Sequence, residues 1–195
     1  MPRYAMVIKT HLCTGCQTCS VACKMENLTL PGCARTVMTE RIDATWQVSV
    51  CMQCENPPCV PVCPADATRK NELGMITVDQ ETCIGCGNCI EACPYGARHM
   101  NPDRGYFREP LAFETTSRKA KEAHRRQVAG RVDKCDWCLH RVRAGRPPMC
   151  VEACTTGARV FGDRDDPKSG VSRLLRDGAK PLRPELGTIP KVFYL

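Results

Sequence analysis

The chain has 195 residues and a formal net charge of +7, and 17 of its residues are cysteines. This length fits one domain or two small ones, and the sequence lacks the roughly 18 consecutive apolar residues that a bilayer-spanning helix needs. Hydrophobic residues make up 43% of the chain, but that share includes the cysteines, and aromatic residues make up only 5%. The apolar core is therefore expected to be thin, which leaves the cysteines as the plentiful groups that can hold the fold together.

The N-terminal segment, residues 1–9, has too short an apolar stretch to act as a secretory signal. The odd number of cysteines also argues against a secreted disulfide framework. Both observations favour cysteine thiolates that serve as metal ligands in a reducing compartment. Export of the chain would then depend on a partner's signal or on a processed precursor.

Sixteen of the cysteines fall into four groups, and each group ends in two cysteines separated by three residues. Group one is Cys13, Cys16, Cys19 and Cys23; group two is Cys51, Cys54, Cys59 and Cys63; group three is Cys83, Cys86, Cys89 and Cys93; group four is Cys135, Cys138, Cys150 and Cys154. Only Cys33 stands outside these groups, and we interpret it as a small buried hydrophobic residue.

Group three matches the run Cys-x2-Cys-x2-Cys-x3-Cys-Pro that bacterial ferredoxins use to bind [4Fe–4S] clusters. In that run, three closely spaced cysteines bind one cluster and the fourth cysteine ligates the neighbouring cluster. Zinc typically uses two Cys-x2-Cys pairs per tetrahedral site, so a third cysteine in the same short loop has no role there. The spacing therefore predicts iron–sulfur clusters, with zinc a stronger alternative for groups two and four, which carry insertions.

The sequence around the last cysteine is repeated between groups three and four. Residues 91–98 read Glu-Ala-Cys-Pro-Tyr-Gly-Ala-Arg, and residues 152–159 read Glu-Ala-Cys-Thr-Thr-Gly-Ala-Arg. Four copies of one cysteine unit predict two ferredoxin-like modules that bind two clusters each.

The residue after the last cysteine indicates which groups belong together. Pro64 and Pro94 follow it in groups two and three, whereas Lys24 and Thr155 follow it in groups one and four. We therefore predict a nested arrangement, in which an inner module uses groups two and three and an outer module uses groups one and four. The predicted ligand sets are Cys51, Cys54, Cys59 and Cys93; Cys83, Cys86, Cys89 and Cys63; Cys13, Cys16, Cys19 and Cys154; and Cys135, Cys138, Cys150 and Cys23.

The predicted fold is α+β: two pseudo-symmetric bacterial ferredoxin-like modules with little regular secondary structure. Strands are expected at residues 46–50, which alternate in polarity, and at residues 74–79, which are rich in β-branched residues. Short helices of one or two turns are expected to start at each final cysteine. The predicted divisions are an outer module of residues 1–50 and 131–160, an inner module of 51–105, a basic insertion of 106–130 and an extended C-terminal tail of 161–195, which contains four prolines.

The excess of positive charge is concentrated in residues 117–131, which hold six Lys or Arg residues and one Glu. Such a segment can indicate nucleic-acid binding. Anionic iron–sulfur clusters would, however, offset much of the basic excess, so no nucleic-acid partner is expected. The segment is interpreted as a helical insertion or a loop that contacts a protein partner. The four histidines show no ligand spacing and no pairing with a nucleophile, so no catalytic residue is predicted.

Six segments of the chain resemble the four-cluster iron–sulfur subunit of dimethyl-sulfoxide-reductase-type molybdoenzymes, nearest the polysulfide, thiosulfate and arsenate reductase branch. They are residues 1–8, 22–27, 55–59, 134–138, 161–163 and 182–194. The resemblance implies a catalytic partner with a molybdenum or tungsten bis-pterin cofactor and, in many relatives, a membrane subunit that handles quinol. It carries the sixteen ligand cysteines onto the positions above.

Together these patterns predict an electron-transfer subunit, with no enzymatic activity of its own, that moves single electrons through four [4Fe–4S] clusters. Three alternatives stay open: a subunit of a soluble transhydroxylase or aromatic-dehydroxylase complex, a stand-alone polyferredoxin, and a zinc-rich structural or nucleic-acid-binding module. The expected location is peripheral to the membrane, on the periplasmic side through co-export with the partner, or otherwise the cytoplasm.

Overall fold

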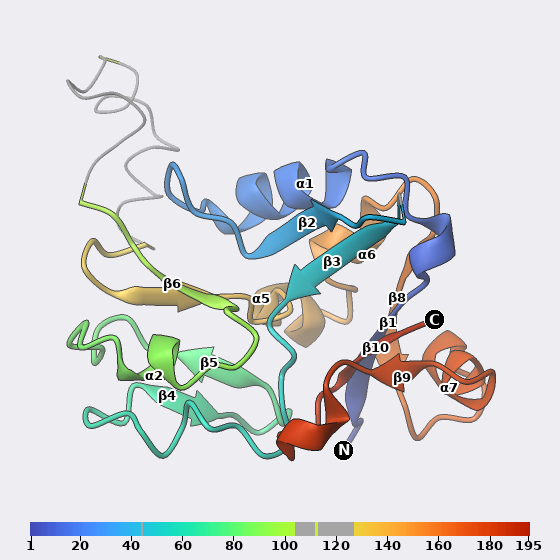
Figure 1. The fold of residues 1–195 in the computed structure, drawn as a ribbon. Coiled ribbons are helices and arrows are strands. Elements are labelled where there is room, and N and C mark those ends of the chain that lie inside the picture. The colour runs from blue at the N-terminus through green and yellow to red at the C-terminus, as the bar shows by residue number, and fades with distance from the viewer. Residues whose placement is uncertain (44, 104–111, 113–126) are drawn as a thin grey trace.

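The structure is a computed structural model that describes residues 1–43, 45–103, 112 and 127–195. Most of the predicted basic insertion, residues 106–130, lies outside this description. The described part combines short helices with small sheets (Figure 1), in agreement with the predicted α+β class. No helix among the described residues is long and apolar enough to cross a membrane.

A four-stranded sheet forms the right-hand part of the molecule in Figure 1. Its order is β8 (Arg159–Asp163), β1 (Tyr4–Ile8), β10 (Val192–Tyr194) and β9 (Lys180–Pro181), with β1 parallel to β10 and antiparallel to β8. Strand β1 is buried on both faces: Met6 and Ile8 face the main core, and Ala5 and Val7 pack with Val171 of α7 (Gly170–Arg176). This alternation follows from the two-residue period of a β-strand.

Residues 161–195 do not form the extended tail that we predicted. They contain α7, the 3-10 helix η2 (Pro184–Leu186) and strands β9 and β10, which join the central sheet. The Ser169 hydroxyl caps α7 by accepting a hydrogen bond from the Ser172 amide at 3.0 Å. The prediction was wrong because the prolines in this segment interrupt no helix: Pro184, for example, is the first residue of η2, where a proline is tolerated.

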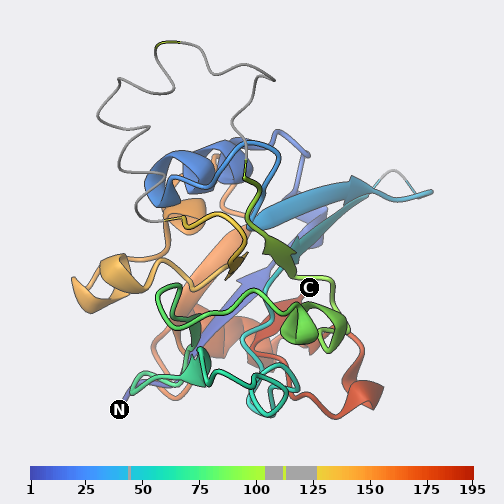
Figure 2. The ribbon, with the colours of Figure 1, turned by 90° about the vertical axis from the view of Figure 1, so that its left-hand side faces the viewer.

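Three two-stranded antiparallel sheets contain the rest of the described strands. They are β2 (Thr36–Glu40) with β3 (Trp46–Val50), β4 (Thr68–Lys70) with β5 (Ile76–Val78), and β6 (Arg98–Met100) with β7 (Val132–Lys134). The predicted strand at residues 46–50 is β3, and the centre of the one predicted at 74–79 is β5. The β2–β3 hairpin projects from the body of the molecule, as Figure 2 shows.

The helices near the cysteines begin earlier than we predicted. They are η1 (Thr10–Leu12), α1 (Thr18–Asn27), α2 (Asn88–Glu91), α5 (Leu139–Arg143) and α6 (Met149–Glu152). Helices α2 and α6 contain the third cysteine of their groups and end before the fourth. Helix α1 contains both the third and the fourth cysteine of group one. The third and fourth cysteines of a group are four positions apart, which is about one turn of a helix. The helix therefore occupies the interval between these two cysteines. A proline after the last cysteine, as at Pro94, disfavours helix at that cysteine.

The buried core confirms that cysteines stand in for apolar side chains. The main cluster of buried residues contains Met6, Trp137 and Val192 together with cysteines of groups one, two and four, and a second cluster joins Ile76 and Val132 to cysteines of groups two and three. Cys33, outside the groups, is also buried. The cysteine groups therefore lie inside the fold and determine how its elements pack.

Two glycines in the cysteine loops are required by crowding. Gly85 has a φ of +73°, and a Cβ atom built on it would lie 2.1 Å from the carbonyl oxygen of Gly130. At the matching position in group one, Gly15 has a φ of +67°, and its Cβ would lie 2.1 Å from the Trp46 ring. Gly87 has a φ of +81° but meets nothing within 4 Å. Gly87 therefore needs only the left-handed backbone, whereas Gly85 and Gly15 also need the absence of a side chain.

Gly85→Ala is expected to destabilise the protein by about 3 kcal/mol, because alanine adds a clash with Gly130 to the strain of a left-handed backbone. Gly87→Ala is the matched control and should cost only the backbone strain, about 1–2 kcal/mol. Thermal unfolding of the anaerobically purified protein measures both losses. Equal melting temperatures for the two variants would contradict the crowding at Gly85.

Candidate metal-cluster sites

All 17 cysteines are free thiols, and their burial ranges from fully buried to exposed. Cys16 and Cys86 are exposed, one in group one and one in group three. The absence of disulfides among the cysteines, all of which are described, leaves every thiol available to bind metal. The side-chain environments of the four groups differ, and they indicate which thiols lie together.

Cys23 of group one lies among the cysteines of group four. The side chain of Asn27, only 1% exposed, donates hydrogen bonds from Nδ2 to the Sγ atoms of Cys23 and Cys138, each at 3.4 Å. Burial raises the pKa of Cys23 to about 12, and the neighbouring thiols of Cys150 and Cys138 add to the rise. Helices α1 and α6 pack against each other and bring these segments together.

A pocket is lined by Cys13, Cys16 and Cys19 of group one and by Cys154 of group four. Ile8, Met38 and Val48 form its apolar wall, and Arg159 also lines it. The hydroxyl of Thr18, 3.4 Å from the Cys16 sulfur, is the main cause that lowers the pKa of Cys16 to about 7. The last cysteine of group four therefore lies with the first three of group one.

The cysteines of groups two and three also lie near one another, and one buried cluster joins Cys59 of group two to Cys83 and Cys89 of group three. Burial raises the pKa of Cys54 to about 11, and the nearby thiols of Cys51, Cys59 and Cys93 contribute to the rise. Cys63 packs against the buried cluster that contains Cys83 and Cys89 of group three.

The last cysteines of groups two and four have the same local hydrogen bonding. Cys63 accepts from the backbone amides of residues 65, 67 and 68, and Cys154 accepts from those of residues 156, 158 and 159. The donors are two, four and five positions after the cysteine in both cases. Although burial opposes the effect, these amides lower the pKa of both thiols. The turn after each cysteine thus favours a negatively charged sulfur.

Two buried arginines lie beside the cysteine sulfurs. Arg98, 5% exposed, donates from Nη2 to the Sγ atom of Cys59 at 2.9 Å. Arg159, 4% exposed, lines the pocket of group one, and its Nη1 atom is buried with no hydrogen-bond partner in the described part of the chain. A buried donor without an acceptor is costly, so this pocket fits a group that brings anionic acceptor atoms with it.

Among the described residues, no three His, Cys, Asp or Glu side chains are placed to hold one ion. A zinc site needs four ligands within about 2.3 Å of one atom, whereas a cluster of four irons binds one thiolate at each iron and holds its ligands further apart. Cysteine-only ligand sets with surrounding N–H donors suit iron–sulfur clusters, which bind through thiolates and accept hydrogen bonds at sulfur.

The four cysteine groups form a continuous series through the protein. Cys59 packs in the same buried cluster as Cys83 and Cys89, which joins group three to group two. Burial raises the pKa of Cys135, and the Cys51 thiol is close enough to add to that rise, which joins group two to group four. The series then reaches group one, and the exposed thiols Cys86 and Cys16 belong to groups three and one, at its two ends.

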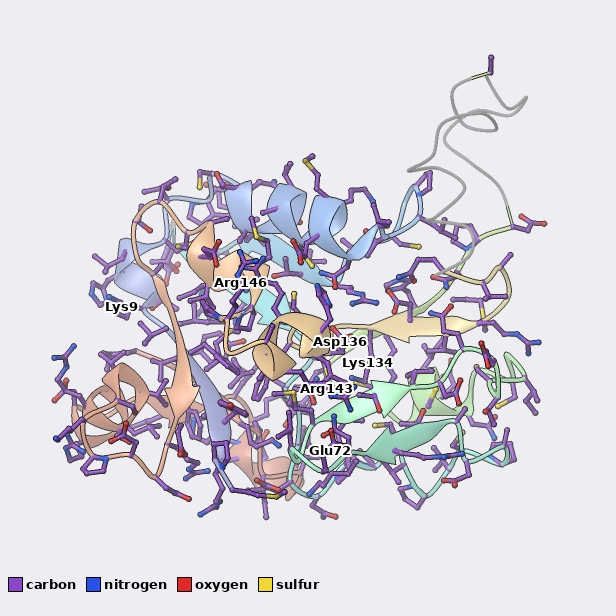
Figure 3. All side chains as sticks on the ribbon, turned by 180° about the vertical axis from the view of Figure 1, so that it is seen from behind. Lys9, Glu72, Lys134, Asp136, Arg143 and Arg146 are labelled. Atoms are coloured by element: carbon purple, nitrogen blue, oxygen red, sulfur yellow. The ribbon has the colours of Figure 1, made fainter. Side chains whose placement is uncertain are left out.

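Polar contacts between helices hold the segments that carry these thiols. Glu26 of α1 accepts a hydrogen bond from His140 of α5 at 2.7 Å and from Arg141 at 3.4 Å, and Arg141 also pairs with Glu152 of α6. Figure 3 shows Arg143 and Glu72 side by side, where an ion pair of 2.7 Å joins α5 to the loop between β4 and β5. These pairs fix the groups relative to one another.

Sequence reasoning missed several residues that surround the thiols. Asn27 carries no motif signal, because an amide one helical turn after a cysteine is unremarkable in a sequence. Arg98 and Arg159 did carry a sequence signal, because both occupy the same place in the repeated segment. Their shared position was noted only as part of the repeat.

Glu26→Gln is expected to lower the stability by about 1 kcal/mol near neutral pH, because it removes the charge that His140 and Arg141 contact. The hydrogen bond from His140 is the main cause that lowers the pKa of Glu26. This contribution is therefore complete above the ordinary carboxyl pKa of about 4.3 and is lost as the pH falls through the lowered value. The measured difference in melting temperature from the wild type should stay constant from about pH 7 to about pH 5 and shrink as the pH falls below about 4.

The matched control for that series is Glu185→Gln, which removes an exposed carboxylate near Arg183. It should change the melting temperature little at any pH. A Glu26→Gln difference that stays constant across the range would contradict the role given to the carboxylate.

Comparison with known proteins identifies the family. Residues 42–110 and 119–164 match the model of a 4Fe-4S dicluster domain, and residues 10–26 match a 4Fe-4S binding domain. The chain is 42% identical to a tetrathionate reductase subunit of Salmonella typhimurium, over 99% of this chain and 72% of that protein. It is 36% identical to the arsenate respiratory reductase iron-sulfur subunit of a Shewanella species, over 99% of this chain and 96% of that protein. Against a component of the polysulfide reductase of Wolinella succinogenes the identity is 36%, over 99% of this chain and 94% of that one. This chain therefore belongs to the 4Fe-4S dicluster family of iron–sulfur subunits of reductase complexes.

Proposed function

We propose that this chain carries single electrons through four [4Fe–4S] clusters between a catalytic subunit and a second redox partner. The observation that carries the proposal is that free thiols from distant segments lie together, as in the pocket that Cys13, Cys16 and Cys19 share with Cys154. The matched 4Fe-4S domains support the same cofactor. The chain supplies ligands and their surroundings, and the reaction with substrate belongs to its partner.

The proposed ligand sets follow the nested order predicted from the sequence. They are Cys13, Cys16, Cys19 and Cys154; Cys135, Cys138, Cys150 and Cys23; Cys51, Cys54, Cys59 and Cys93; and Cys83, Cys86, Cys89 and Cys63. The Asn27 contacts to Cys23 and Cys138 support the second set, and the shared pocket supports the first.

We assign residues 51–105 to an inner module and residues 1–50 with 131–160 to an outer one. The pseudo-symmetry proposed between them is supported by Arg98 and Arg159, which follow the last cysteine of their groups by five positions and are both buried. Since the central sheet contains β9 and β10, residues 161–195 are assigned to the outer module's side of the fold.

The chain's residues prepare each site for an anionic redox group. Iron–sulfur clusters supply one-electron oxidation and reduction at potentials that depend on burial, hydrogen bonds and charge. The apolar side chains of the two buried clusters exclude water from most of the thiols. Asn27 and the amides after Cys63 and Cys154 donate hydrogen bonds to sulfur. Exposed Cys86 and Cys16 mark the two ends at which electrons would enter and leave.

The relatives suggest the partners. The tetrathionate reductase and polysulfide reductase relatives are, by name, single components of larger reductases. We infer a large catalytic partner with a molybdenum or tungsten bis-pterin cofactor, and an integral membrane subunit that handles quinol. The complex would lie peripheral to the membrane, on the periplasmic side through co-export with the catalytic subunit.

Anaerobic purification followed by metal analysis tests the proposal. About sixteen irons per chain are expected, together with paramagnetic signals after reduction with dithionite. Stoichiometric zinc without iron would overturn it. A co-purifying large chain with molybdenum or tungsten is expected, whereas its absence after gentle extraction would favour a stand-alone polyferredoxin. Failure to find quinol-linked activity in a loaded complex would favour the soluble transhydroxylase type.

Serine substitutions test the nested ligand sets. Cys23→Ser and Cys138→Ser should alter the same cluster signal in electron paramagnetic resonance spectra, because both thiols belong to one set. Cys13→Ser is the matched control from the same sequence group as Cys23 and should alter a different signal. If Cys23→Ser and Cys13→Ser alter one signal in common, the sets are not nested.

A further inference from the structure

Two arginines occupy the same place in the internal repeat and the same kind of place in the fold. Arg98 and Arg159 each follow a final cysteine by five positions, and each is the first residue of a strand, β6 or β8. Both side chains are almost completely buried. Buried arginines are rare unless a partner neutralises them, so the partners of these two require explanation.

Arg98 lies between the two cysteine sets of the inner module. Its Nη2 atom contacts the Cys59 sulfur at 2.9 Å, and its Nη1 atom donates to the hydroxyl of buried Thr68 at 3.2 Å. Although burial opposes it, the thiols of Cys59 and Cys89 raise the pKa of Arg98. Cys59 and Cys89 belong to different proposed clusters, so one guanidinium faces both.

Arg159 occupies the corresponding position in the outer module. Its Nη2 atom donates to the hydroxyl of buried Thr36 at 2.6 Å. Arg159 lines the pocket that contains Cys19, and β8 packs against α6, which contains Cys150. Cys19 and Cys150 belong to different proposed clusters, and against the effect of burial both thiols raise the pKa of Arg159. Its Nη1 atom has no partner among the described residues. Each arginine is thus held by a threonine and directed at two sets of thiols.

Neither guanidinium pairs with a carboxylate in the part of the chain that the structure describes. The contrast is Arg35, also buried, which pairs with Asp133 at 2.7 Å and with Asp136 at 3.1 Å. The charge of Arg35 is therefore cancelled locally. The charges of Arg98 and Arg159 are left to act on the sulfur ligands, through surroundings that screen them little.

Resting on the proposed function, we propose that Arg98 and Arg159 are positioning residues for electron transfer, each of which raises the reduction potentials of both clusters in its module. Reduction adds one negative charge to a cluster, and a nearby cation stabilises the reduced form more than the oxidised form. Because each arginine faces two clusters, it raises both potentials together. The arginine therefore shifts the two potentials in the same direction and adds little to the difference between them.

Redox titration of the full chain in its anaerobically purified complex, followed by electron paramagnetic resonance, tests this. Arg159→Gln should lower the midpoint potentials of the two outer clusters, and Arg98→Gln those of the two inner ones. The expected change is at least tenfold in the reduction equilibrium, about 59 mV for a one-electron couple. Arg159→Lys keeps the charge and should restore most of the shift. Arg176→Gln, which removes an exposed arginine of α7 that donates to the Pro167 carbonyl, is the control and should shift none.

The outcomes separate this inference from the proposed function. A wild-type protein without four clusters would refute the function before any variant is compared. Fully loaded glutamine variants with unchanged potentials, or with all four potentials shifted equally, would overturn the role of the arginines. Loss of iron from both glutamine variants would also overturn it, because the arginines would then serve only to retain the clusters.

Discussion

The fold depends on thiols from distant segments meeting at shared sites. Asn27 is the clearest case, since its amide contacts Cys23 in its own helix and Cys138, which is 111 residues further along the chain. The apolar core is thin, and cysteines form much of its buried surface. Hairpins, short helices and the central sheet therefore pack around the cysteine sets. A thin apolar core of this kind is typical of small domains that rely on a metal to fold.

Burying so many sulfur ligands creates an electrostatic problem that the chain solves with its own cations. The net charge of +7 is carried partly by side chains inside the fold. Lys134 and Lys191 are buried along with the two repeat arginines, and Lys134 donates to the carbonyl of Cys135 at 2.8 Å. Lys191 also lies 5.7 Å from the centre of the Trp137 ring. Some of the basic side chains thus lie inside the fold beside the cysteines. The basic composition is therefore weaker evidence for nucleic-acid binding.

The chemistry of the chain could be predicted from its sequence better than its secondary structure could. Cysteine spacing is set directly by the geometry of a cluster, so the four groups could be identified without coordinates. The strand at residues 46–50 could be identified from its alternating polarity. The helix positions were wrong because the interval between Cys19 and Cys23 is itself helical. The prediction for the tail was wrong because its prolines interrupt no helix or strand: Pro181 ends β9, Pro184 begins η2, and the other two lie in loops. Asn27 could not be found, since its contact with Cys138 exists only once α1 and α5 have come together.

The order in which the chain is made bears on how it matures. Strand β1 near the N-terminus pairs in parallel with β10, and the Thr10 hydroxyl donates to the carbonyl of Leu195, 185 residues away. Contacts of such large sequence separation form late and slowly. Strand β1 therefore stays without its partner β10 until residues 192–194 have been synthesised. The pocket that Cys13, Cys16 and Cys19 share with Cys154 likewise forms only after the segment that carries Cys154 has left the ribosome.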